Sequence, residues 1–292
     1  MIKRSPLVSV EWLRARLGDP GIVVLDSSVY LDPAPEGCAR GEFRSGLDQY
    51  IDGGHIPGAR FADLFTEFSD PTSPFPFTRP QKDQFEAAAS RLGITPETHV
   101  IAYDGLVGQW ASRLWWVFRT LGHTRISVLD GGLRKYLAEG GEIEKGVTPY
   151  EKTNYAASGP TKPYARKDQV ENIVAGRSSG QLVCLLQPND YSGAISVRSR
   201  AGHIPGSVNL PFTRLVNEQD NTLLPPDRLK ALFRSVTPLN GELVVTYCGG
   251  GIASTLGALA LEVIGYDNAL EYDGSLAEWS SDPGLPMITG AD

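Results

Sequence analysis

The strongest constraint on the fold is that the chain contains the same pattern twice. Three segments of the first half return in order in the second: GHIPGAR (54–60) as GHIPGSV (202–208), HVIAYDG (99–105) as LVVTYCG (243–249), and VLDGGL (128–133) as EYDGSL (271–276). Their separations are 148, 144 and 143 residues, a drift that loop insertions in two copies of one domain would produce. Two long copies indicate a duplicated domain and not a solenoid of short repeats.

Each copy alternates short apolar runs with stretches of helical character. The expected strands are IVVLD, GARFADL, THVIAYD and ISVLDGG in the first copy, and QLVCLL, GSVNLPF, ELVVTY and ALEYDG in the second. Apolar strands separated by helices are typical of a parallel sheet with helices on both faces, so we expect two tandem α/β domains. A stretch rich in Gly, Pro, Lys and Glu separates the copies, and it predicts a linker at 143–162 between domains 1–142 and 163–292.

Charge and cysteine content narrow the classes of function. The net charge of −7, without a basic run, argues against a nucleic-acid partner. No apolar run approaches the length of a membrane span, and the start lacks a signal-peptide core, so we expect a cytoplasmic protein without a membrane partner. Cys38, Cys184 and Cys248 are too few and too widely spaced for a disulfide framework or a zinc site. We therefore expect neither a metal nor a cofactor.

Cys248 follows the apolar run ELVVTY and precedes three glycines. This order places it at the carboxyl edge of the predicted sheet, where open α/β sheets bind their ligands. Glycines and a helix that begins near Ile252 would offer backbone N–H groups to an anion and lower the pKa of the thiol. Cys248 is therefore a candidate nucleophile, with a small buried packing residue as the alternative. Cys184 is expected in the core and Cys38 in an exposed loop.

The equivalent of Cys248 in the first copy is Asp104, in YDGLVGQW. A carboxylate would be an odd replacement for a residue that only packs, so the pair indicates one reactive copy and one inert copy. The helix that follows Asp104 carries three tryptophans. We expect these in the core and between the domains, with some lining a cleft above Cys248.

The sequence fits three other classes of protein with a reactive cysteine or a glycine-rich loop less well. A cysteine phosphatase needs an arginine six residues after its cysteine to hold the phosphoryl oxygens, but Ser254 stands there. A cysteine protease needs a histidine partner, and His55 and His203 occupy matching repeat positions, which indicates a structural role. The sequence YCGGG is also not the dinucleotide-binding pattern.

These motifs in register resemble the two-domain rhodanese-like sulfurtransferases, which comprise the thiosulfate and 3-mercaptopyruvate sulfurtransferases. The shared features are GHIPGA in both copies, the run YDGLVGQWASRLWWVFRTLGHTRISVLDGGL in an inert first domain, and a six-residue loop, here CGGGIA, that begins with the catalytic cysteine. The resemblance implies an inert rhodanese-like domain at 1–142 and a catalytic one at 163–292.

The resemblance also implies a ping-pong reaction. Cys248 would take the outer sulfur of a small anionic donor as a persulfide and pass it to a thiol, cyanide or a protein acceptor. The loop amides expected to stabilise the persulfide belong to Gly249, Gly250, Gly251, Ile252 and Ala253.

Departures from the family pattern leave the donor open. Thiosulfate-type loops carry basic residues where Gly249 and Gly250 stand, and Asp190 falls where a substrate-binding arginine is often found. Arg198 or Arg200 could contact the donor anion instead, or both could be solvated loop residues. The alternative function is a catalytically weak rhodanese-fold module that binds a partner or senses oxidation.

Overall fold

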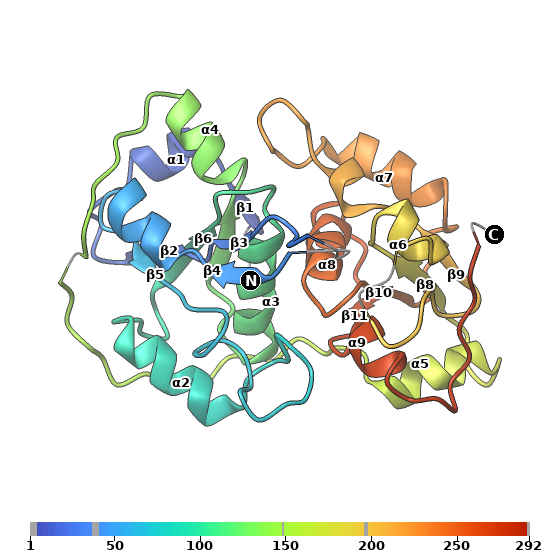
Figure 1. Ribbon diagram of the computed structural model, residues 1–292. Coiled ribbons are helices and arrows are strands. Elements are labelled where there is room, and N and C mark those ends of the chain that lie inside the picture. Colours follow the sequence, from blue (N-terminus) through green and yellow to red (C-terminus); the bar gives the residue numbers. More distant parts are fainter. Residues whose placement is uncertain (1–4, 37–40, 148, 196–197, 291–292) are drawn as a thin grey trace.

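The computed structural model describes residues 5–36, 41–147, 149–195 and 198–290, so Cys38 lies outside the described residues. Figure 1 shows two lobes side by side, the first built from the N-terminal half of the chain and the second from the C-terminal half. Each lobe has its own parallel sheet. The two tandem α/β domains expected from the duplication are therefore present.

The first lobe contains a five-stranded sheet in the order β1-β7-β6-β2-β5, and every neighbouring pair is parallel. Its strands are β1 (Leu7–Val8), β2 (Ile22–Asp26), β5 (Arg60–Phe61), β6 (His99–Tyr103) and β7 (Ile126–Leu129). Its helices are α1 (Val10–Arg14), a π-helical turn η1 (Gln49–Gly53), α2 (Lys82–Arg91), α3 (Gln109–Thr120) and α4 (Gly132–Ala138). A separate antiparallel hairpin is formed by β3 (Val29–Leu31) and β4 (Phe43–Ser45).

Helices cover both faces of the first sheet because its central strands are apolar on both sides. In β6, Val100 and Ala102 belong to the large core that contains α2 and α3, whereas Ile101 and Tyr103 belong to a second cluster with residues of α1 and α4. Successive strand residues point to opposite faces, so a strand buried throughout needs a cover on each side.

The second lobe repeats this plan with a four-stranded parallel sheet in the order β11-β10-β8-β9. Its strands are β8 (Gln181–Cys184), β9 (Ser207–Asn209), β10 (Val244–Tyr247) and β11 (Ala269–Glu271). Its helices are α5 (Lys167–Val174), α6 (Pro188–Ser192), a 3-10 turn η2 (Phe212–Leu215), α7 (Pro226–Arg234), α8 (Ala253–Val263) and α9 (Ser275–Trp279). Helix α8 begins next to Ile252, as expected.

The repeated histidines have the same structural role in both lobes. His55 stacks on Tyr50 and His203 stacks on Tyr191, each with ring centroids 3.7 Å apart. The Nδ1–H of each ring donates to the carbonyl oxygen of the same tyrosine, at 2.8 Å for His55 and 2.9 Å for His203. The fold therefore uses these histidines to close a turn, as their matching positions indicated.

The lobes meet where α3 packs against α8 (Figure 1). Trp110, Trp115 and Trp116 of α3 are all buried, which agrees with the expected core and interdomain location of the tryptophans. Arg113 of α3 is fully buried, and its guanidinium forms an ion pair with Asp273 of the second lobe at 2.7 Å. The interface is thus both apolar and ionically paired.

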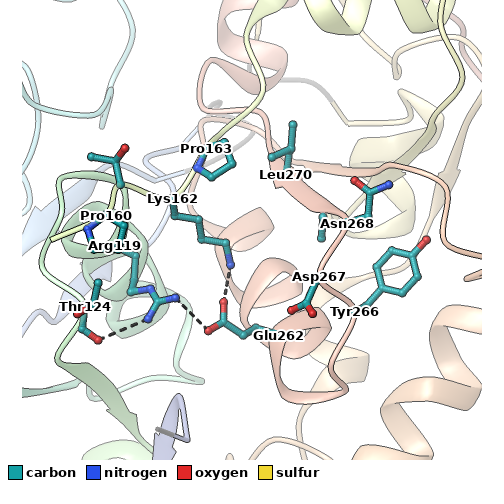
Figure 2. Close-up of a pocket in the computed structure, with 12 residues that line it drawn as sticks. Arg119, Thr124, Pro160, Lys162, Pro163, Glu262, Tyr266, Asp267, Asn268 and Leu270 are labelled. Atoms are coloured by element: carbon teal, nitrogen blue, oxygen red, sulfur yellow. Dashed lines mark hydrogen bonds and ion pairs between the residues drawn. The ribbon is translucent and has the colours of Figure 1, made fainter. Parts of the chain in front are cut away.

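The predicted linker runs along the first lobe, without helix or strand among its described residues. The Thr153 N–H donates to the Ser90 carbonyl oxygen at 2.9 Å, and the Lys162 N–H donates to the Arg119 carbonyl oxygen at 2.9 Å. Figure 2 shows the end of this segment, where Glu262 of α8 pairs with both Lys162 and Arg119 beside an interdomain pocket of about 320 Å³. This ion-pair cluster joins the linker to both lobes. The domain limits given above stay a prediction.

A membrane-spanning helix and a metal-binding cluster are both absent from the described ranges. No helix in them is long and apolar enough to cross a membrane. No group of His, Cys, Asp and Glu side chains there is arranged to hold a metal ion.

Candidate active site

Cys248 lies directly after β10, at the carboxyl edge of the second sheet, and its side chain is 2% exposed. The loop 248–253 turns from this strand into α8. Gly251 has a φ of +76°, and a Cβ there would lie 2.7 Å from the Asp273 carbonyl oxygen. A Cβ on Gly249 would overlap the Arg198 guanidinium. Gly251 therefore requires glycine for its left-handed backbone, whereas at Gly249 the end of the flexible Arg198 side chain would have to move.

The Cys248 sulfur is surrounded by hydrogen-bond donors. The Ser254 Oγ lies 3.4 Å from it, where its hydroxyl can donate to the sulfur, and the backbone N–H groups of Gly250 and Ser254 also point at it. Burial raises the pKa of this thiol, but these donors and the nearby Arg198 guanidinium outweigh burial and bring the pKa below its usual value. The thiolate, which is the nucleophilic form, is thereby favoured.

Cys184 is a useful contrast because it is also a buried free cysteine. It lies within β8 and is fully buried. Burial raises the pKa of the Cys184 thiol to about 12. Cys184 is thus a core residue, as expected.

Arg198 is the predicted anion contact that the structure brings to the cysteine loop. Its Nε–H donates to the Gly249 carbonyl oxygen at 2.9 Å, and its side chain lines the pocket above Cys248. Asp190, which stands in α6 where the family often has an arginine, does not line that pocket.

Arg200 makes different contacts, and its role as an anion contact stays a prediction. Its guanidinium donates to four backbone carbonyl oxygens, those of Trp279 (3.2 Å), Ser280 (3.0 Å), Asp282 (2.6 Å) and Leu285 (2.6 Å). These hydrogen bonds engage the guanidinium N–H groups and fix the segment at the end of α9 and after it. Arg200 is absent from the described lining of the cysteine pocket.

The pocket above Cys248 has a volume of about 290 Å³ and is built from both lobes. Among its described lining residues, those from the first lobe are Val29, Leu31, Phe43, Pro76, Phe77, Leu106, Gln109 and Trp110. Those from the second lobe, beside Cys248 and its loop, are Leu186, Arg198 and Phe212. Arg198 is the single charged side chain in this described lining. The described lining therefore forms a mainly apolar cavity with one cation beside the Cys248 sulfur.

The first-lobe loop that begins with Asp104 holds its own anion. Asp104 Oδ1 accepts from the N–H groups of Leu106 (2.8 Å) and Gly108 (3.1 Å), and Oδ2 accepts from those of Trp110 and Ala111 (both 2.9 Å). Burial raises the pKa of this carboxyl above its usual value, although the four N–H donors act in the opposite direction. Both oxygens act only as acceptors, as those of an ionised carboxylate do.

Sequence reasoning missed several parts of the site. The hairpin β3–β4, which supplies Leu31 and Phe43, is far from Cys248 in the chain and gave no sequence signal. Ser254 was noted only because it is not an arginine, yet it contacts the sulfur. Glu271 accepts from the Ser254 hydroxyl at 2.7 Å. Its acidic side chain in an otherwise apolar strand was a signal that could have been used.

Comparison with known proteins shows which family the chain resembles. The model of the rhodanese-like domain matches residues 9–139 and 177–282. The chain is 34% identical to thiosulfate/3-mercaptopyruvate sulfurtransferase 2 of Arabidopsis thaliana, over 97% of this chain and 86% of that protein. It is 34% identical to 3-mercaptopyruvate sulfurtransferase of Rattus norvegicus, over 94% of this chain and 91% of that protein. The crystal structure of SseA, a 3-mercaptopyruvate sulfotransferase from Escherichia coli, superimposes with a TM-score of 0.80 at 29% identity, covering 93% of this chain and 99% of that one.

Proposed function

The chain belongs to the rhodanese-like domain family and is a sulfurtransferase, and from this premise we propose that Cys248 carries the transferred sulfur as a persulfide. The observation that supports this proposal most directly is the ring of donors around the Cys248 sulfur. The twin loop in the first lobe holds a carboxylate with the same backbone arrangement, which supports an anion-binding role for both loops.

The reaction would proceed in two transfers. The Cys248 thiolate attacks the outer sulfur of the donor, a sulfur–sulfur bond forms, and the bond that held this sulfur in the donor breaks with its electron pair leaving on the donor remnant. An acceptor nucleophile, such as a thiol, cyanide or a protein cysteine, then attacks the outer sulfur and releases the Cys248 thiolate. The amides of residues 249–253 and the Arg198 guanidinium stabilise the negative charge in both steps.

The lining of the pocket favours one class of donor. Thiosulfate is a dianion, and its transfer from water into an apolar cavity with one described cation leaves a charge without compensation. A monoanion whose sulfur is bonded to carbon, such as 3-mercaptopyruvate, places a carboxylate near Arg198 and its remaining atoms against apolar side chains. We therefore expect a higher kcat/KM for 3-mercaptopyruvate than for thiosulfate.

The proposed compartment is a reducing one such as the cytoplasm. Cys184 and Cys248, the cysteines within the described ranges, are both free thiols, and the proposed chemistry requires Cys248 in that form.

Mass spectrometry of the Cys248 peptide tests the proposal. After incubation with 3-mercaptopyruvate we expect this peptide to gain one sulfur atom, and cyanide should remove it as thiocyanate. Cys248→Ser should abolish both the gain and the turnover, whereas Cys184→Ala should retain them. If a folded wild-type protein gains no sulfur from either donor, the persulfide proposal fails and a binding or redox-sensing module is favoured.

A further inference from the structure

We propose that Glu271 stores the proton of the Cys248 thiol and exchanges it with the sulfur through the hydroxyl of Ser254. This inference rests on the proposed role of Cys248 and adds to it a route for the proton that the sulfur must lose before it attacks. Glu271 is a positioning residue in this scheme, because it acts on the sulfur only through Ser254.

A continuous chain of short contacts links the three side chains. The Ser254 Oγ lies 3.4 Å from the Cys248 Sγ and 2.7 Å from the Glu271 Oε1. All three residues are at most 2% exposed. A serine hydroxyl has one proton and can donate it to only one of its two neighbours at a time. The two hydrogen-bond directions are therefore alternatives, and each corresponds to one location of the shared proton.

The exchange conserves protons and charge. With the proton on the sulfur, the Cys248 S–H donates to Ser254, whose hydroxyl donates to the Glu271 carboxylate. When the sulfur ionises, its proton moves to the Ser254 oxygen, and the proton of that hydroxyl moves to the Glu271 Oε1. The negative charge has then moved from the carboxylate to the sulfur, and the Ser254 hydroxyl now donates to the thiolate. Release of the Cys248 thiolate after the second transfer allows the same proton to return.

The surroundings of Glu271 disfavour a permanent carboxylate. Its Oε2 is buried and has no hydrogen-bond partner among the described residues. Burial raises the pKa of the Glu271 carboxyl well above its usual value, the charge of Asp273 raises it further, and the Arg113 guanidinium acts in the opposite direction. The pKa of the Cys248 thiol is instead lowered, because its hydrogen-bond donors and the Arg198 guanidinium outweigh the effect of burial. The two proton affinities therefore approach each other, which is the condition for sharing one proton.

The duplicated lobe shows that the fold itself does not need this polar pair. Counted from the loop's first residue, Ser254 corresponds to Trp110 of the Asp104 loop. The sheet register makes Glu271 the counterpart of Val128, because Glu271 pairs with Thr246 as Val128 pairs with Ala102. Both positions are apolar in the first lobe, which has Asp104 in place of Cys248. The serine and the glutamate occur together with the sulfur that the serine contacts.

The test is the pH dependence of the rate at which iodoacetamide alkylates Cys248, followed on the Cys248 peptide. If Cys248 and Glu271 share a proton, the wild-type alkylation rate should rise twice as the pH increases. Between the two rises, while the pair holds one proton, the rate should stay on a plateau below its maximum. In Glu271→Gln the amide keeps the contact with Ser254 but cannot accept a proton, so the profile should show one rise without a plateau. Ser254→Ala, which removes the hydroxyl donor from the thiolate, should slow alkylation at neutral pH about tenfold.

Glu242→Gln is the matched control, because it makes the same substitution at an exposed position and should keep the two-step profile. A single rise in the wild type, superimposable on that of Glu271→Gln, would overturn the proposal, and so would a plateau that survives in Glu271→Gln. If Glu271→Gln does not fold, Ser254→Ala decides: an unchanged rate would overturn the proposal. Alkylation needs no sulfur donor, so this outcome is independent of whether Cys248 forms a persulfide.

Discussion

The Asp104 and Cys248 loops are built alike but begin with different acidic side chains. Each follows an inner strand of its sheet and leads into a helix at the interface between the lobes. The same backbone bond anchors both: Leu133 N–H donates to the Asp104 carbonyl oxygen at 3.0 Å, and Leu276 N–H donates to the Cys248 carbonyl oxygen at 3.1 Å. The anion cradle is therefore a property of the repeated backbone, and the side chain at its first position decides what the cradle is used for.

In the first loop a carboxylate fills the cradle permanently and accepts four backbone N–H bonds. In the second loop the sulfur receives two backbone N–H groups and the Ser254 hydroxyl, and it faces an open pocket. A fixed anion stabilises the first turn, whereas the proposed thiolate in the same place would remain available to a substrate.

Cys248→Asp would make the second loop a copy of the first and should have the largest effect. The new carboxylate can accept the loop N–H groups, so the fold should persist. The nucleophile is lost, and kcat should fall by a factor of at least about 10³. Steady-state turnover and thermal unfolding of the same sample check both parts. Turnover within tenfold of the wild type would show that Cys248 does not carry the sulfur.

Asp104→Ala would empty the first cradle and leave its N–H donors buried without partners. We expect the free energy of unfolding to fall by about 3 kcal/mol, measured in urea, because unsatisfied buried donors bear the full cost of desolvation. Asp52→Ala, at an exposed position, is the control and should change little. A variant as stable as the wild type would contradict the role assigned to the Asp104 carboxylate.

Arg198→Ala and Arg200→Ala separate the roles of these two nearby arginines and should have the smallest effect on turnover. Loss of Arg198 should raise KM for 3-mercaptopyruvate about tenfold, because a charge-assisted contact with the carboxylate disappears. Loss of Arg200 should lower the melting temperature and leave KM unchanged, since its guanidinium binds four backbone carbonyl oxygens. Equal KM values for the two variants would remove Arg198 from the donor site.

The sequence predicted the features that depend on local pattern. The repeated motifs gave the duplication, and the run before Cys248 gave a strand whose end is the carboxyl edge of the sheet. The predicted strands GARFADL and GSVNLPF were too long, because β5 and β9 are edge strands that pair over only two and three residues.

Features that depend on distant contacts could not be predicted in this way. Arg198 and Arg200 are two residues apart. Only the path of the segment after α9 determines which of them donates hydrogen bonds to the carbonyl oxygens of that segment. The link from Ser254 to Glu271 joins a helix start to a neighbouring strand, and it depends on the β10–β11 register. The Leu31 and Phe43 side of the pocket arises from docking of the lobes, which no local pattern encodes.

Leu31 and Phe43 belong to the lobe without the cysteine, yet they lie across from it in the pocket. A sulfane sulfur stored on Cys248 would therefore be sheltered by hydrocarbon that the first lobe provides. Shelter of this kind lengthens the lifetime of a reactive intermediate by keeping water and stray reductants away from it. The first lobe would thus enclose the proposed persulfide, and a second lobe expressed alone would leave the same sulfur open to solvent.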